Sequence, residues 1–141
     1  MSARPLFSST RTSPSSAWVV WGALNAALAV ALSALAAHLP LAPGAQAAWV
    51  QSALEMHRFH ALGLIGVGGG VMVRPESRLL PWAGILMSLG TVLFCLNLYA
   101  RAWWGWDVLK SLVPWGGMAF ILSWGVLGVG WVMGRQRSGA H

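Results

Sequence analysis

The sequence contains few charged residues. Only 9% of its 141 residues are charged, and three are acidic, whereas soluble domains carry roughly 25% charged residues. This composition excludes an ordinary soluble domain. Cysteine is also scarce, because Cys95 stands alone, which excludes an internal disulfide and a zinc-binding cysteine spacing. Since Cys95 lies inside an apolar run, we expect it to be a buried thiol.

Hydrophobic residues make up 57% of the chain, which also contains ten Trp and 17 Gly. Trp is enriched at membrane interfaces, and Gly at contacts between membrane helices. The net charge of +6 does not indicate nucleic-acid binding, because the basic residues separate apolar runs and do not cluster on one face. We therefore predict an integral membrane protein that contacts the lipid bilayer and has no nucleic-acid partner.

Four apolar runs are long enough to cross a membrane as helices. They are residues 17–39, 47–73, 81–100 and 113–133. Helices of this length match the ~30 Å hydrocarbon core, and lipid leaves no other way to satisfy the backbone of such a run. Because the connections are short, the sequence predicts an all-α membrane protein with four transmembrane helices in an up-and-down bundle. Residues 1–16 are expected to form a disordered cytoplasmic tail, and residues 134–141 a second cytoplasmic tail.

The first run resembles a secretory signal in one respect. A basic leader precedes it, and Ala34-Leu35-Ala36 imitates a cleavage site. The apolar region of a signal is usually ~7–15 residues long, and this run is longer. We expect it to be retained as an uncleaved helix.

Charge is concentrated in the second run, where Gln51, Glu55 and Arg58 follow one another at spacings of four and three residues. This spacing places the three side chains on one stripe of a helix. His60 lies on nearly the opposite side, and His57 lies between, closer to His60. Glu55 and Arg58 are suitably spaced to form an ion pair, because charges inside membranes generally pair or face a wet cavity.

Other polar residues are predicted near the same end of the bundle. His38 ends the first run, and Asn97 lies near the end of the third. We expect the bundle to enclose one polar site, whose candidate residues are His38, Gln51, Glu55, Arg58, His60 and Asn97. Removing Glu55 should then cause an intermediate loss of stability, between ~0.6 kcal/mol for an average membrane polar contact and ~3–5 kcal/mol for a broken buried pair.

This site has three interpretations. Its residues can be structural, with hydrogen bonds and an ion pair that fix the register of the helices. They can form a small binding pocket or a proton-accessible site, since ionisable residues within membranes are often functional. They can also ligate a metal or a haem through His38 with His60 or His57, although the unequal depths of these histidines do not favour this.

Several motifs resemble the YgdD-like family of small inner-membrane proteins, the domain of unknown function 423, which is related to the transmembrane protein 256 group. They are Ala37-His38, Phe59-His60-Ala61-Leu62, Leu89 to Phe94 followed by Leu98-Tyr99, Pro114, Gly116-Gly117 and Trp124. The resemblance covers about residues 21–133 and implies a four-helix fold in the bacterial inner membrane, without an activity. The family often has Tyr-Gln where this chain has Met56-His57. His57 and Arg58 therefore look like local features, which leaves His38, Glu55 and His60 as the better candidates.

No nucleophile–base pair, nucleotide loop or metal-ligand spacing is visible in the sequence, so we predict no catalytic residues and no cofactor. The expected function is that of a non-enzymatic accessory or interaction protein, which packs against other membrane proteins or against copies of itself. A small transporter or channel subunit with a polar site in its outer half is the alternative. A haem or redox membrane protein is a third possibility.

The distribution of basic residues predicts the orientation of the bundle. The N-terminal tail, the second loop and the C-terminal tail carry six of them: Arg4, Arg11, Arg74, Arg78, Arg135 and Arg137. The other side has only Arg101 and Lys110, and the side richer in Lys and Arg is usually cytoplasmic. Both termini should therefore be cytoplasmic.

Single cysteines at Ser2 and Ala140, placed in a Cys95→Ala background, test this orientation. An impermeant thiol reagent should leave both sites unlabelled in intact cells and label both after permeabilisation. Labelling of either site from outside intact cells would contradict the prediction.

Overall fold

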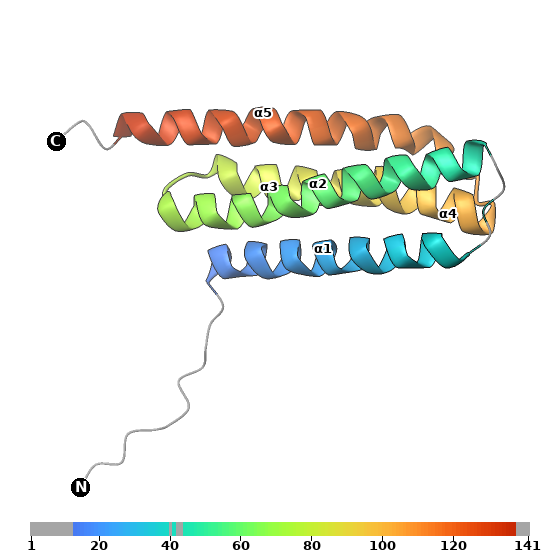
Figure 1. Ribbon diagram of the computed structural model, residues 1–141. Helices are drawn as coiled ribbons and strands as arrows, with labels where there is room; N and C mark the ends of the chain where they lie inside the picture. The colour runs from blue at the N-terminus through green and yellow to red at the C-terminus, as the bar shows by residue number, and fades with distance from the viewer. Residues whose placement is uncertain (1–12, 40, 42–43, 138–141) are drawn as a thin grey trace, which may run out of the picture.

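The computed structural model describes residues 13–39, 41 and 44–137, and this part of the chain forms helices without strands. The helices are α1 (Pro14–His38), α2 (Ala45–Val73), α3 (Leu79–Gly90), the π-helix η1 (Thr91–Leu96), α4 (Asn97–Trp104), the 3₁₀ turn η2 (Lys110–Leu112) and α5 (Val113–Arg137). Because α3, η1 and α4 follow one another without a break, the architecture is a bundle of four long helices. The helices alternate in direction, so α1 begins and α5 ends at the same end of the bundle (Figure 1).

The structure confirms an all-α bundle of four long helices in the described residues, while the fourth transmembrane span stays a prediction. Three helical segments are long and apolar enough to cross a membrane: Pro14–His38, Leu79–Trp104 and Lys110–Met133. The α2 helix, with 29 residues, is the longest of the bundle. It falls outside this group because its first half contains the polar residues around Glu55 and Arg58.

Two of the expected tails are partly helical. Residues 14–16 belong to α1, because the Ser13 side chain accepts a hydrogen bond from the Ser16 backbone N–H at 3.3 Å and Pro14 occupies the first helical position. Both features start helices. At the other end, the backbone of residues 134–137 continues α5. The remainder of the expected tails, residues 1–12 and 138–141, lies outside the described residues.

The α2 helix is the centre of the bundle. It contacts α1, α3, η1, α4 and α5, and Figure 1 shows it between α1 and α5, with α3 and α4 behind it. Buried side chains gather around it in two clusters. One contains Leu54, Cys95 and Tyr99, and the other contains Leu64 and Met87. The expected burial of Cys95 is therefore confirmed, since its side chain is 0% exposed.

The π-helical segment changes the direction of the side chains that follow it. A π turn contains more residues than an α turn, and such segments occur frequently at functional sites. Directly after η1, three consecutive residues are buried: Asn97, Leu98 and Tyr99. The sequence could not reveal this segment, because its residues continue an apolar run that is compatible with an ordinary α-helix.

Glycines allow α1 and α2 to approach closely. A Cβ atom on Gly68 would lie 2.5 Å from the Val19 Cγ2 atom and 2.9 Å from the Ser15 carbonyl oxygen. A Cβ atom on Gly22 would lie 2.9 Å from the Ala61 carbonyl oxygen. Small residues at such contacts let helix backbones pack directly against one another in a membrane.

Replacing Gly68 with Ala should separate α1 from α2 and destabilise the protein by about 1–3 kcal/mol, the usual effect of overpacking. The matched control is Gly125→Ala in α5, because a Cβ atom on Gly125 meets nothing within 4 Å. Thermal unfolding in detergent measures both. The Gly68 variant should melt below the parent and the Gly125 variant should not. Equal melting of the two variants would contradict close packing at Gly68.

Candidate functional site

His57 is the centre of a buried chain of hydrogen bonds that joins three helices. The Asn25 Nδ2 atom in α1 donates to the Trp21 carbonyl at 2.9 Å, which turns the Asn25 Oδ1 atom toward the His57 Nε2 atom, 3.2 Å away. Because Oδ1 only accepts, Nε2 carries the proton. The Nδ1 atom is then free to accept from the Tyr99 hydroxyl of α4 at 3.4 Å. His57 is 0% exposed, so this chain fixes three helices from within.

His60 joins α2 to α5 in a similar way. Its Nδ1 atom donates to the Met56 carbonyl at 2.7 Å, and its Nε2 atom accepts from the Trp124 indole N–H at 3.1 Å. The ring stacks on Phe120 with centroids 3.5 Å apart. In the neutral form, both nitrogens of His57 and of His60 are therefore used within the protein. Neither histidine keeps a lone pair for a metal or haem iron.

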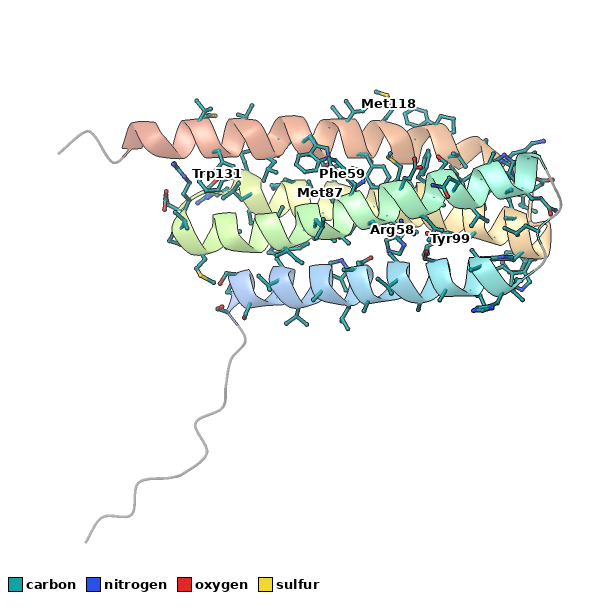
Figure 2. The ribbon with its side chains drawn as sticks, in the orientation of Figure 1. Arg58, Phe59, Met87, Tyr99, Met118 and Trp131 are labelled. Carbon is teal, nitrogen blue, oxygen red and sulfur yellow. The ribbon has the colours of Figure 1, made fainter. Side chains whose placement is uncertain are left out.

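The charged residues of α2 lie on its outer surface. Gln51, Glu55 and Arg58 are all exposed, and we call these three residues the α2 stripe. The Gln51 Nε2 atom donates to the Glu55 Oε1 atom at 2.7 Å, and the Arg58 Nη2 atom donates to the Ser33 hydroxyl of α1 at 2.7 Å. Figure 2 shows Arg58 on the side of α2 that faces α1.

Two expectations about Glu55 are therefore wrong. Glu55 does not lie inside the bundle, and it does not pair with Arg58. Within the described part of the chain, the only ion pair joins the Arg101 Nε atom to the Asp107 Oδ1 atom at 2.8 Å. Spacing along α2 permits a contact between Glu55 and Arg58, but α1 lies beside Arg58 and offers it the Ser33 hydroxyl instead.

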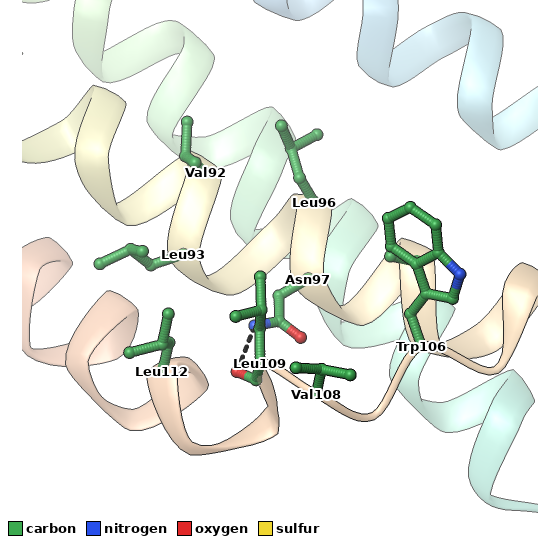
Figure 3. A pocket seen from close by; sticks show the side chains of 9 residues that line it. Val92, Leu93, Leu96, Asn97, Trp106, Val108, Leu109 and Leu112 are labelled. Carbon is green, nitrogen blue, oxygen red and sulfur yellow. Dashed lines mark hydrogen bonds between the residues drawn. The ribbon is translucent and has the colours of Figure 1, made fainter.

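The remaining candidates lie elsewhere in the bundle. His38 is exposed at the last residue of α1. Asn97 is buried, and its Nδ2 atom donates to the Leu109 carbonyl at 2.6 Å. Asn97 lines a cavity of about 590 Å³ whose other walls are apolar: Val92, Leu93, Leu96, Ala100, Trp106, Val108, Leu109 and Leu112 (Figure 3). This cavity provides one amide and no charge.

The six candidate residues consequently do not form one polar site. His60 lies in the core, and the α2 stripe is exposed. His38 is exposed at the end of α1, and Asn97 is bonded to the Leu109 carbonyl beside the apolar cavity. Across the residues that the structure describes, no three His, Cys, Asp or Glu side chains come together as metal ligands would. Sequence reasoning missed Asn25, Tyr99 and Trp124, and set His57 aside. Asn25 could have been found as the only amide side chain in the first apolar run.

Comparison with known proteins identifies relatives along most of the chain. The family model described as "Protein of unknown function (DUF423)" matches residues 32–117. UPF0382 inner membrane protein YgdD of Escherichia coli K12 is 31% identical over 125 residues, which are 87% of this chain and 95% of that protein. UPF0382 membrane protein YwdK of Bacillus subtilis is 35% identical over 109 residues, which are 76% of this chain and 89% of that protein. No solved structure matches.

Replacing His57 with Leu should destabilise the protein, because it leaves Asn25 and the Tyr99 hydroxyl without their partner. A buried polar group left unsatisfied costs about 1–3 kcal/mol. His38→Leu is the control, since His38 is exposed, and it should melt like the parent. Adding Asn25→Leu to the His57 variant should recover part of the loss, because fewer polar groups then lack a partner. Thermal unfolding in detergent measures all three variants. Unchanged melting of His57→Leu would contradict a stabilising role for the hydrogen bonds around His57.

Proposed function

Because this chain belongs to the DUF423 family of membrane proteins, as its motifs indicated, we propose that it is a non-enzymatic interaction protein of the inner membrane. In this proposal it packs against other membrane proteins through the α2 stripe. The observation that carries the proposal is the exposure of Glu55 and Arg58 on a helix that lies among three apolar, membrane-length segments. We also place both termini in the cytoplasm, on the strength of the basic residues that flank the helices.

The proposal requires that α2 is the fourth membrane-spanning helix. Its packing along α1 and beside α3, α4 and α5 (Figure 1) supports a position at the same depth as its neighbours. With 29 residues, it extends about 43 Å, more than the ~30 Å hydrocarbon core. Arg58 follows the first residue of α2 by 13 positions, or about 20 Å along the helix. In this proposal Arg58 lies near the middle of the membrane, and Glu55 lies about 4.5 Å nearer the N-terminal end of α2.

Charges at this depth are unfavourable against lipid. A charged side chain at the centre of a membrane helix costs about 2.5–3.5 kcal/mol on insertion scales, and more in simulations. Both charges of the α2 stripe are exposed, and each is hydrogen-bonded to a neutral group of the same chain. A second protein that covers the α2 stripe would remove these charges from lipid.

The other functions considered for this sequence receive less support. A transport site would gather polar groups along one path, whereas the buried histidines use their nitrogens within the core. The cavity beside Asn97 is almost entirely apolar. A haem site would require a histidine with a free lone pair inside the bundle, and neither His57 nor His60 provides one.

Photocrosslinking tests whether protein or lipid covers the α2 stripe. A photoreactive amino acid at Leu62, which is 64% exposed and follows Arg58 by four residues, should yield an adduct with a protein. The control is the same replacement at Leu89, which is 46% exposed on α3. It should give lipid adducts only. Lipid adducts alone at both positions would overturn the proposed function.

A further inference from the structure

The exposed face of α2 extends beyond its charges. After the α2 stripe, the outward positions continue with Leu62, Gly66 and Gly69, at spacings of four, four and three residues from Arg58. A Cβ atom on Gly66 or on Gly69 would meet nothing within 4 Å, so packing inside the chain does not require glycine there. Glycine is a poor helix former, but it lets another membrane helix approach closely. These features indicate that another helix packs along this face.

The charges on this face are balanced. The α2 stripe contains one acid, Glu55, and one base, Arg58. Neither takes part in the ion pair of the described residues, which joins Arg101 to Asp107. A guanidinium has five N–H donors, and a carboxylate has about four acceptor positions. Arg58 donates a hydrogen bond to Ser33, and Glu55 accepts one from Gln51. Both groups therefore keep the capacity to bind an opposite charge.

We propose that the partner is a second copy of this chain, which docks through the α2 stripe in a two-fold dimer. This inference rests on the proposed function and names its partner. In a two-fold interface, each surface meets itself, so a residue pair formed once is formed twice. Glu55 of each copy pairs with Arg58 of the other, and the dimer contains two such pairs.

The membrane makes this arrangement geometrically simple. Two copies inserted in the same direction are related by an axis along the membrane normal, so their α2 helices meet at equal depth. Glu55 and Arg58 are three residues apart, or about 4.5 Å along the helix, a difference that the long arginine side chain can span. A hollow of about 530 Å³ beside Arg58, lined also by Val30, Ser33, Ala34 and Ala37, leaves room for side chains of the second copy.

Charge complementarity favours a second copy over other occupants of this face. A lipid phosphate belongs to the headgroup region, whereas Arg58 lies about 20 Å along α2 and Glu55 about 15 Å. An anion would also satisfy Arg58 and leave Glu55 exposed. An unrelated protein would need both an acid and a base within reach of Arg58 and Glu55. A second copy provides both, displaced by three residues, or about 4.5 Å, along its own α2.

Disulfide crosslinking detects the dimer directly. Leu62→Cys, in a Cys95→Ala background, places one thiol per chain on the face near the two-fold axis. Mild oxidation of native membranes should yield a species of twice the chain mass. Leu89→Cys on α3 is the matched control and should remain monomeric. Equal crosslinking from both positions would indicate random collision and overturn the dimer.

Charge reversal tests the Glu55–Arg58 pairs in the Leu62→Cys chain. Glu55→Arg gives a stripe with two bases, and Arg58→Glu gives a stripe with two acids. Each variant alone should give at least about tenfold less crosslinked dimer than the Leu62→Cys parent, which corresponds to about 1.4 kcal/mol of dimerisation free energy. Co-expression of the two variants, with distinguishable tags, should restore a mixed dimer. The chain with both reversals should also crosslink with itself.

The neutral variants Glu55→Gln and Arg58→Gln distinguish loss of the dimer from misfolding, because they keep hydrogen-bonding groups at both positions. If the reversed chains fail to accumulate, each neutral variant should still crosslink severalfold less than the parent while melting at the same temperature after dilution to monomer. Unchanged crosslinking in the neutral variants, or no recovery in the mixed pair, would overturn the reciprocal pairs. A protein adduct at Leu62 whose mass is not twice that of the chain would overturn the dimer and leave the proposed function standing.

Discussion

A polar group within the hydrocarbon of a membrane must find its partner in protein, because the hydrocarbon offers none. Inside the bundle, this constraint is met completely at the two histidines of α2. Asn25 and Tyr99 satisfy His57, while Met56 and Trp124 satisfy His60. These contacts join α2 to α1, α4 and α5, so the most polar helix is also the one around which the others assemble.

The same constraint is met only in part on the outside. Glu55 and Arg58 are each hydrogen-bonded to an uncharged neighbour, and both remain exposed. A helix that stabilises the bundle through its inner face thus leaves opposite charges on its outer face. The proposed dimer follows from that difference between the two faces. It requires only the Glu55 and Arg58 side chains that each copy already carries.

Much of the fold could be predicted from the sequence, but the position of the polar residues could not. Long apolar runs separated by short polar segments indicate helices, and all four long helices are present. Spacing also predicted correctly that Glu55 and Arg58 share a stripe. It could not show which way the stripe faces, because both faces of a membrane helix are apolar. His57 was discounted because Met56-His57 departs from the family pattern, yet its side chain is buried while that of Glu55 is exposed.

The π-helical segment η1 also restricts how the length of this chain can vary among relatives. Each residue of an α-helix advances the chain by about 100° around the axis. Loss of one residue between Thr91 and Leu96 would convert the wide turn into an ordinary α turn. Everything after it, including Tyr99, would then rotate away from its present direction relative to α3. Insertions and deletions should therefore be tolerated in residues 105–109, outside the helices, and be absent from η1.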